Sequence, residues 1–167
     1  TLRQEEFHAK NAKIAKRVRM DVEELATIAV DCGLQVHKEV GPGLLESAYE
    51  AILAAMLRER GLHVERQKLV EIRFANLKID EGFRADIVIE GKLLLELKAM
   101  EKLLPVHGKQ VLTYLHFLEM PLGLLMNFGE PMFKSGLRRI VNNHTATKKS
   151  PLHIIKSNLF AFFASFA

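Results

Sequence analysis

The sequence predicts an α/β fold, because helical and strand patterns follow one another along residues 22–143. Apolar residues recur at helical spacing up to residue 60, and the period changes to two beyond Gly61. Residues 83–98 have the composition of a buried β-hairpin with a turn near Glu90-Gly91. We therefore expect helices and strands to pack together in one α/β domain.

Two helices are expected before the first strand. Asp21 followed by Glu24 is a capping-box pattern, which begins a helix over 22–40. Gly41-Pro42-Gly43 interrupts the chain, and a second helix over 44–60 ends at Gly61. Their apolar positions are Leu25, Ile28, Ala29, Cys32 and Val36, and then Tyr49, Ile52, Leu53, Met56 and Leu57.

The remaining elements lie on either side of the hairpin. Alternating residues over 70–74 predict a strand with one buried face, and Asn76 begins a turn into a short arm over 77–80. Pro105 starts a helix over 105–118, residues 122–128 form a buried strand, and 134–142 is expected to be a short helix. The inward positions of the 105–118 helix are Val111, Leu112, Leu115 and Leu118.

The net charge of +4 belongs to the two ends of the chain. Residues 1–20 hold six Lys/Arg and two Glu, and residues 144–167 hold three Lys and no acid. The body over 21–143 has 15 basic and 18 acidic residues, so the bulk charge does not show that the body binds nucleic acid. We expect a basic extension over 1–21, a domain over 22–143, and a basic, Phe-rich extension over 144–167.

The composition predicts a cytoplasmic protein that does not bind membranes. A single cysteine, Cys32, excludes a framework of intrachain disulfides. No apolar run approaches the roughly 20 residues that span a bilayer, and no signal peptide precedes the first charged residues. The end of the chain, NLFAFFASFA, holds four of the ten phenylalanines. This segment either docks on the body, a second copy or a partner protein, or forms an extension without a fixed place.

A three-residue loop, Glu90 to Lys92, is predicted because it gives the hairpin one wholly apolar face. It pairs 89 with 93, 87 with 95 and 86 with 96, whereas a two-residue loop would mix apolar and charged side chains on both faces. Gly91 can adopt the left-handed conformation that such loops require. The other face then carries Arg84, Asp86, Glu96 and Lys98.

In this register Asp86 and Glu96 are opposite one another, with Cβ atoms roughly 5 Å apart, and they repel unless a cation lies between them. One interpretation is that Lys98 and Arg84 neutralise both acids in an ion-pair network. The other is a divalent metal, because carboxylate oxygens suit Mg²⁺ or Mn²⁺. A lysine beside such a metal can orient a water and neutralise charge on a phosphate. Residue types alone leave both interpretations open.

The charged face resembles a known signature. Asp86 followed by Glu96-Leu97-Lys98 is similar to the signature of the PD-(D/E)XK nucleases, with Ala85 where the signature has proline. The predicted order of helix, strand, hairpin, helix and strand is also that of this superfamily. The resemblance implies a restriction-endonuclease-like core, in which a central mixed sheet carries the hairpin in its middle and helices cover both faces.

Two further motifs support the resemblance. Residues Gly43 to Tyr49 match GxxExxY, the motif that names a bacterial and archaeal family placed in this superfamily. Residues Gln110 to Tyr114 match the QxxxY pattern of its RecB-like branch. The resemblance covers about residues 22–143 and includes neither end.

The resemblance implies Mg²⁺- or Mn²⁺-dependent hydrolysis of phosphodiester bonds in nucleic acid, with DNA as the expected substrate. Asp86 and Glu96 would hold the metal with the Leu97 backbone carbonyl, and Lys98 would position the attacking water. Glu46 would support the metal directly or through a water. Gln110 and Tyr114 would position Lys98 or the substrate, and Tyr49 is either a substrate-positioning residue or part of the core. All expected positions are filled, which argues for retained metal chemistry: Glu46, Asp86, Glu96, Lys98 and Gln110.

Two other functions stay open, since a fold does not establish an activity. A non-catalytic nucleic-acid-binding or regulatory module would bind through the basic ends in a salt-dependent manner, without metal-dependent turnover. A structural or interaction protein would carry a neutralised ion-pair network on the hairpin and contact a partner through the Phe-rich tail.

Overall fold

The computed structural model describes residues 3–8, 11, 20–74 and 76–143. In this part of the chain, five strands form one sheet in the order β1-β2-β3-β4-β5. Strands β3 and β4 are parallel and the other neighbours are antiparallel, which confirms the predicted mixed sheet with the hairpin in its middle. The bounds are β1 Val64–Phe74, β2 Leu77–Ile89, β3 Leu93–Lys98, β4 Leu122–Asn127 and β5 Leu137–Val141.

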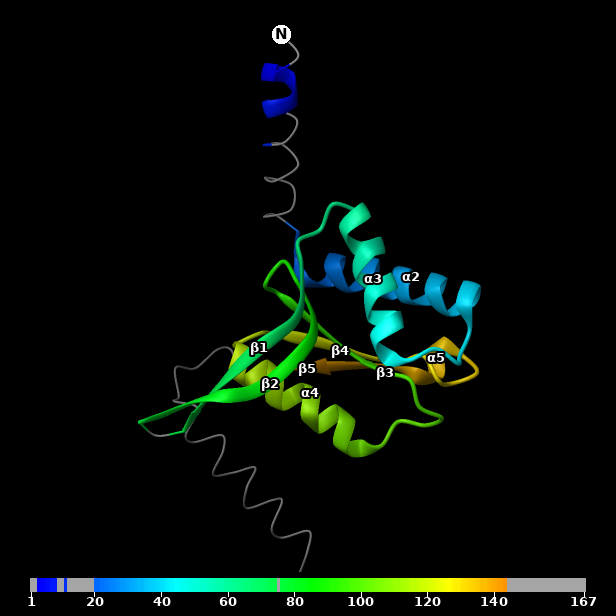
Figure 1. The fold of residues 1–167 in the computed structure, drawn as a ribbon, viewed down its shortest axis with the longest axis vertical. Coiled ribbons are helices and arrows are strands. Elements are labelled where there is room, and N and C mark those ends of the chain that lie inside the picture. Colours follow the sequence, from blue (N-terminus) through cyan, green and yellow to red (C-terminus); the bar gives the residue numbers. More distant parts are fainter. Residues whose placement is uncertain (1–2, 9–10, 12–19, 75, 144–167) are drawn as a thin grey trace, which may run out of the picture.

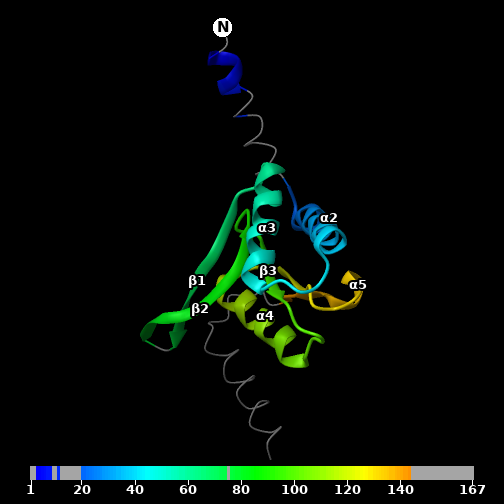
Figure 2. The same cartoon turned by 45° about the vertical axis from the view of Figure 1, so that its right-hand side comes forward.

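Helices cover both faces of the sheet, as predicted. Helices α2 (Val22–Val40) and α3 (Glu46–Glu59) lie on one face, and α4 (Pro105–Leu118) lies on the other (Figures 1 and 2). The capping box of α2 is confirmed, because the Glu24 amide donates to Asp21 Oδ1 at 2.8 Å and the Asp21 amide donates to Glu24 Oε2 at 2.9 Å. No helix in the described ranges is long and apolar enough to cross a membrane.

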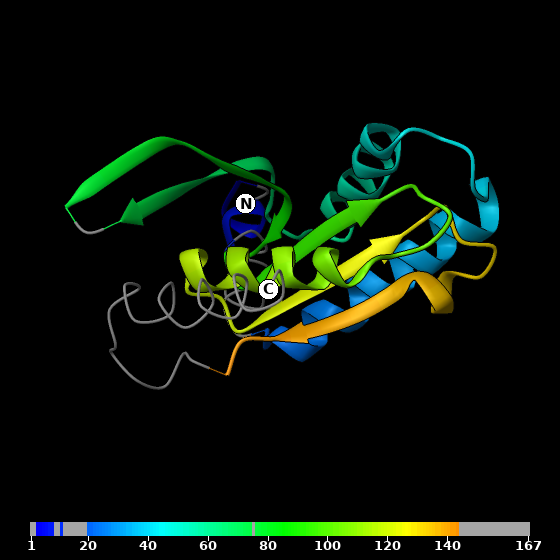
Figure 3. The ribbon, with the colours of Figure 1, turned by 90° about the horizontal axis from the view of Figure 1, so that it is seen from below.

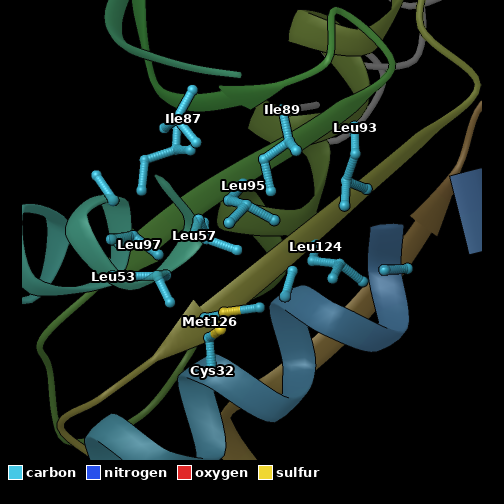
Figure 4. Packing of buried hydrophobic residues seen from close by; sticks show 14 of the residues in the cluster. Cys32, Leu53, Leu57, Ile87, Ile89, Leu93, Leu95, Leu97, Leu124 and Met126 are labelled. Carbon is cyan, nitrogen blue, oxygen red and sulfur yellow. The ribbon is translucent and has the colours of Figure 1, made fainter. Parts of the chain in front are cut away.

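The sheet separates two cores. The first fills the space between α2, α3 and the sheet, and Figure 4 shows side chains of β2, β3 and β4 meeting those of the two helices. The second lies between the sheet and α4 and includes Val88, Leu94, Val111, Tyr114 and Leu115. Members of the first core include Cys32, Leu53, Leu57, Ile87, Ile89, Leu93, Leu95, Leu97, Leu124 and Met126.

The predicted three-residue loop is confirmed. Strand β2 ends at Ile89, β3 begins at Leu93, and the ladder pairs Ile89 with Leu93 and Ile87 with Leu95. The Lys92 amide donates to the Ile89 carbonyl at 2.9 Å, and Gly91 has φ 63°. The register therefore places Asp86 and Glu96 one step beyond the last ladder pair.

The predicted helix over 134–142 is wrong. Only Phe133–Gly136 forms a helical turn, α5, and Leu137–Val141 forms β5, which pairs antiparallel with β4. This segment is stabilised by backbone bonds to β4. Leu137 packs against the first core and Ile140 against the second, because successive side chains of a strand point to opposite faces of the sheet. A short segment of this kind has little helical stability of its own.

Strands β1 and β2 are longer than predicted. Strand β1 begins at Val64, and the arms expected over 77–80 and 83–89 form one strand, β2. Figure 3 shows this two-stranded ribbon extending beyond the rest of the sheet. The Phe-rich segment within 144–167 and most of the basic extension over 1–21 lie outside the described residues.

Candidate active site

The candidate site lies where β2 separates from β3. The backbone pairing of β2 with β3 ends at Ile87 and Leu95. The next amide of β3 on this side, that of Leu97, donates to Asp86 Oδ2 at 2.8 Å instead of to a backbone carbonyl of β2. In a strand the N–H and C=O of one residue point to the same side. The Leu97 carbonyl therefore also lies on the Asp86 side of β3.

Glu96 and Lys98 form an ion pair on the end of β3. Lys98 Nζ lies 2.7 Å from Glu96 Oε1, and Glu96 is only 2% exposed. The other carboxylate oxygen, Glu96 Oε2, is buried and has no hydrogen-bond partner among the described residues. A buried polar atom without a partner costs free energy, so the ion pair satisfies only half of this carboxylate.

Electrostatics couple Asp86, Glu96 and Lys98. Burial and the neighbouring Asp86 charge raise the pKa of Glu96 to about 7, although Lys98 opposes this rise. Burial also raises the pKa of Asp86, against the Leu97 N–H bond and the Lys98 charge. Burial acts to lower the pKa of Lys98, but the bond to Glu96 and the surrounding carboxylates raise it overall. Lys98 is therefore an ammonium at neutral pH, whereas Glu96 exchanges a proton near neutrality.

Glu46 projects from the first turn of α3 toward the same cluster. Burial raises its pKa, Lys98 lowers it, and the charges of Asp86 and Glu50 raise it further. A carboxylate in the first turn of a helix is favoured by the dipole. The structure thus brings Glu46 within electrostatic reach of Asp86 and Lys98, and its support of a metal stays a prediction.

Gln110 and Tyr114 lie on α4, the helix on the face of the sheet that α2 and α3 do not cover (Figure 1). Gln110 Nε2 donates to the Tyr114 hydroxyl at 2.7 Å. Burial raises the pKa of Tyr114, the Gln110 bond lowers it, and the charges of Glu96 and Lys98 also act on it. This pair therefore lies beside the carboxylates, with the Tyr114 ring packed in the second core.

Tyr49 lies apart from the carboxylates. Its ring is fully buried and stacks on Phe128, with ring centroids 4.5 Å apart. Its hydroxyl donates to the Gly41 carbonyl at 2.6 Å and accepts the Leu44 amide at 3.1 Å. These contacts fix the loop that precedes Glu46, and they support the core interpretation of Tyr49 rather than direct contact with a substrate.

Two residues of the site were missed in the sequence. Glu50 is 4% exposed and accepts bonds from Arg66 Nε and Gln67 Nε2, both at 2.7 Å. Gln67 Nε2 also lies 3.4 Å from Asp86 Oδ1. Glu50 follows Glu46 by one helical turn on an otherwise apolar segment, and this spacing could have indicated it.

The side chains present fit a hard divalent metal. The available donors are carboxylate oxygens of Asp86, Glu96 and Glu46 and the Leu97 carbonyl, and Glu96 Oε2 has no hydrogen-bond partner in the part of the chain that the structure describes. Among the described residues, no three His, Cys, Asp or Glu side chains converge as a metal cage. Mg²⁺ usually needs no such cage, because it binds one or two carboxylates and keeps several waters.

The fold and the Asp86, Glu96 and Lys98 cluster place the chain in a nuclease-like class of α/β proteins. Residues 23–140 match the family model of the PD-(D/E)XK nuclease superfamily, and the chain belongs to that superfamily. The predicted restriction-endonuclease-like fold is thereby confirmed. A search of curated proteins and a search of solved structures each found no match.

Proposed function

We propose that the protein is a nuclease that hydrolyses phosphodiester bonds in nucleic acid, with DNA as the expected substrate and Mg²⁺ or Mn²⁺ as the cofactor. The observation that carries this proposal is the buried Glu96 carboxylate beside Asp86 and Lys98, because one of its oxygens has no partner within residues 20–74 and 76–143 or the other described positions. The GxxExxY motif over Gly43 to Tyr49 supports a prokaryotic origin within the superfamily. The single cysteine supports a cytoplasmic location.

Each residue has a distinct proposed task. Asp86, Glu96 and the Leu97 carbonyl would hold the metal, with Glu46 supporting it directly or through a water. When bound, the metal supplies Lewis acidity and lowers the pKa of a water. The Lys98 ammonium orients the attacking water and neutralises negative charge on the phosphate. Gln110 and Tyr114, bonded to one another, position Lys98 or the substrate from α4.

The alternative is a non-catalytic nucleic-acid-binding or regulatory module. The ion pair between Lys98 and Glu96 favours this non-catalytic function. In such a module Lys98 would only neutralise the acids and would take no part in a reaction. Against it, no described residue bonds Glu96 Oε2, and the pKa of Glu96 is raised to about 7, so Lys98 neutralises this carboxylate only in part. This alternative predicts salt-dependent binding without turnover.

The test is cleavage of labelled single- and double-stranded DNA by the purified chain with Mg²⁺, Mn²⁺ or EDTA. We expect metal-dependent cleavage by the wild type and none by Glu96→Ala, since this variant loses a metal ligand. Glu59→Gln removes an exposed acid at the end of α3 and is the matched control with wild-type activity. Equal cleavage by wild type and Glu96→Ala would contradict the proposal, as would binding of DNA without any cleavage.

A further inference from the structure

We propose that Gln67 is a positioning residue that holds the Asp86 carboxylate for metal binding, and that the buried Glu50 anchors Gln67. The inference rests on the proposed function, because it assigns a supporting shell to the same metal site. It concerns two residues that no motif includes.

Gln67 occupies the position across the sheet from Asp86. The ladder pairs Arg66 with Ile87 and Lys68 with Ala85, so the residue between them on β1 faces Asp86 on β2. Gln67 itself has φ 50°, an uncommon conformation for a residue other than glycine, which interrupts the ladder at this step. Such outliers persist where surrounding contacts determine them, and they cluster at functional sites.

One amide group connects two carboxylates. Gln67 Nε2 lies 2.7 Å from Glu50 Oε2 and 3.4 Å from Asp86 Oδ1. An amide nitrogen has two hydrogens, so it can donate one to each acid, and the longer contact is near the limit of a hydrogen bond. This bridge places a donor between two acids whose charges interact, since the Glu50 charge raises the pKa of Asp86.

Glu50 is a fixed anchor for the bridge. It is 4% exposed, and Arg66 Nε donates to its other oxygen at 2.7 Å. Both Glu50 oxygens therefore have a defined partner, and the Gln67 amide is held between Glu50 and Asp86.

Both oxygens of Asp86 are consequently held in place. Oδ2 accepts the Leu97 amide at 2.8 Å, and Oδ1 faces Gln67. Each carboxylate oxygen has about two lone-pair sites, so one remains on each for a metal. Residues that orient metal ligands in this way typically change metal affinity by about 10–100-fold when they are replaced.

The test uses Gln67→Gly, since glycine accepts the left-handed backbone while the amide is lost. We expect the midpoint of thermal unfolding in EDTA to fall, because the buried Glu50 Oε2 loses its partner. Calorimetry well below that midpoint, where the variant is folded, is expected to show Mn²⁺ affinity lowered about 10–100-fold. Leu69→Thr, an exposed position on the same strand, is the control and keeps wild-type affinity. If Glu50 acts through Gln67, adding Glu50→Gln to Gln67→Gly weakens Mn²⁺ binding less than the two single losses combined.

The outcomes separate this inference from the proposed function. Asp86→Ala is measured in parallel as the variant that removes a proposed ligand. If Asp86→Ala loses Mn²⁺ binding and Gln67→Gly keeps it, the positioning role is wrong and the metal site stands. If Gln67→Gly lowers the unfolding midpoint but the folded variant binds Mn²⁺ with wild-type affinity, Gln67 is only structural. If Asp86→Ala binds Mn²⁺ as the wild type does, the metal site itself is wrong and the inference fails with it.

Discussion

Replacement of Lys98 by methionine is expected to lower DNA cleavage by about 10²–10³-fold, the range typical of a lost donor that stabilises charge in the transition state. The physical reason is that the ammonium, which is 15% exposed in its side chain and held 2.7 Å from Glu96, is the cation placed to orient water beside the carboxylates. Methionine keeps much of the length and volume of lysine without the charge. Single-turnover cleavage with saturating Mg²⁺ measures the effect.

The metal should still bind when Lys98 is absent. Loss of the Lys98 charge raises the pKa of Glu96 further. A bound divalent cation replaces that charge, so Lys98→Met is expected to retain Mn²⁺ binding by calorimetry at about pH 8.5 although turnover is lost. Lys98→Arg, which keeps a positive charge on a different geometry, should recover part of the activity. Cleavage by Lys98→Met at the wild-type rate would show that Lys98 only neutralises the acids.

The stability of the metal-free protein should fall as the pH rises from about 4.5 to 7. The carboxyl of Glu96 has its ordinary pKa of 4.5 in the unfolded chain, and burial raises that pKa to about 7 in the folded state. Between these values the folded state binds more protons than the unfolded state, so the free energy of unfolding decreases with pH. The shift corresponds to roughly 3 kcal/mol for this group alone. Asp86 and Glu46, whose pKa values are also raised, act in the same direction.

Urea unfolding in EDTA across this pH range measures the loss. Glu96→Gln is the matched variant, because it keeps the shape and removes the titration. It should flatten the slope and be more stable than the wild type near pH 7. A wild-type free energy of unfolding that is flat or rises between pH 4.5 and 7 would contradict the burial of an ionisable Glu96.

Local patterns were sufficient to predict much of the fold. The hairpin register followed from two requirements, one apolar face and a left-handed Gly91, and both are local. The capping box at Asp21 was equally local. Strand β5 could not be predicted in this way, because its stability depends on pairing with β4 rather than on its own sequence. Strands of this kind are specified by distant partners.

The difference between local patterns and contacts with distant strands also decides which site residues could be predicted. Asp86, Glu96 and Lys98 were found because hairpin register and motif agreed on them. Gln67 was missed because its role depends on a left-handed backbone within β1 and on the partner strand that places it opposite Asp86. The strand also changes the core that it faces, since Val64 packs in the first core and Val70 in the second. A strict alternation of two could not predict this change.

The cluster combines features that favour function over stability. Glu96 has a pKa raised to about 7 and a buried oxygen that no described residue bonds, and both are unfavourable for the metal-free fold. Strongly shifted groups of this kind gather at functional sites. If Glu96 had only a structural role, an apolar or amide side chain at this position would serve the stability of the fold better.

The most direct test of the central claim is a crystal structure of the protein soaked with Mn²⁺, with the metal located by its anomalous signal. We expect a Mn²⁺ peak bound by Asp86 and Glu96, with Glu96 Oε2 as one of the metal ligands. A structure at saturating Mn²⁺ with no peak at these carboxylates, and with Lys98 still paired to Glu96, would contradict it.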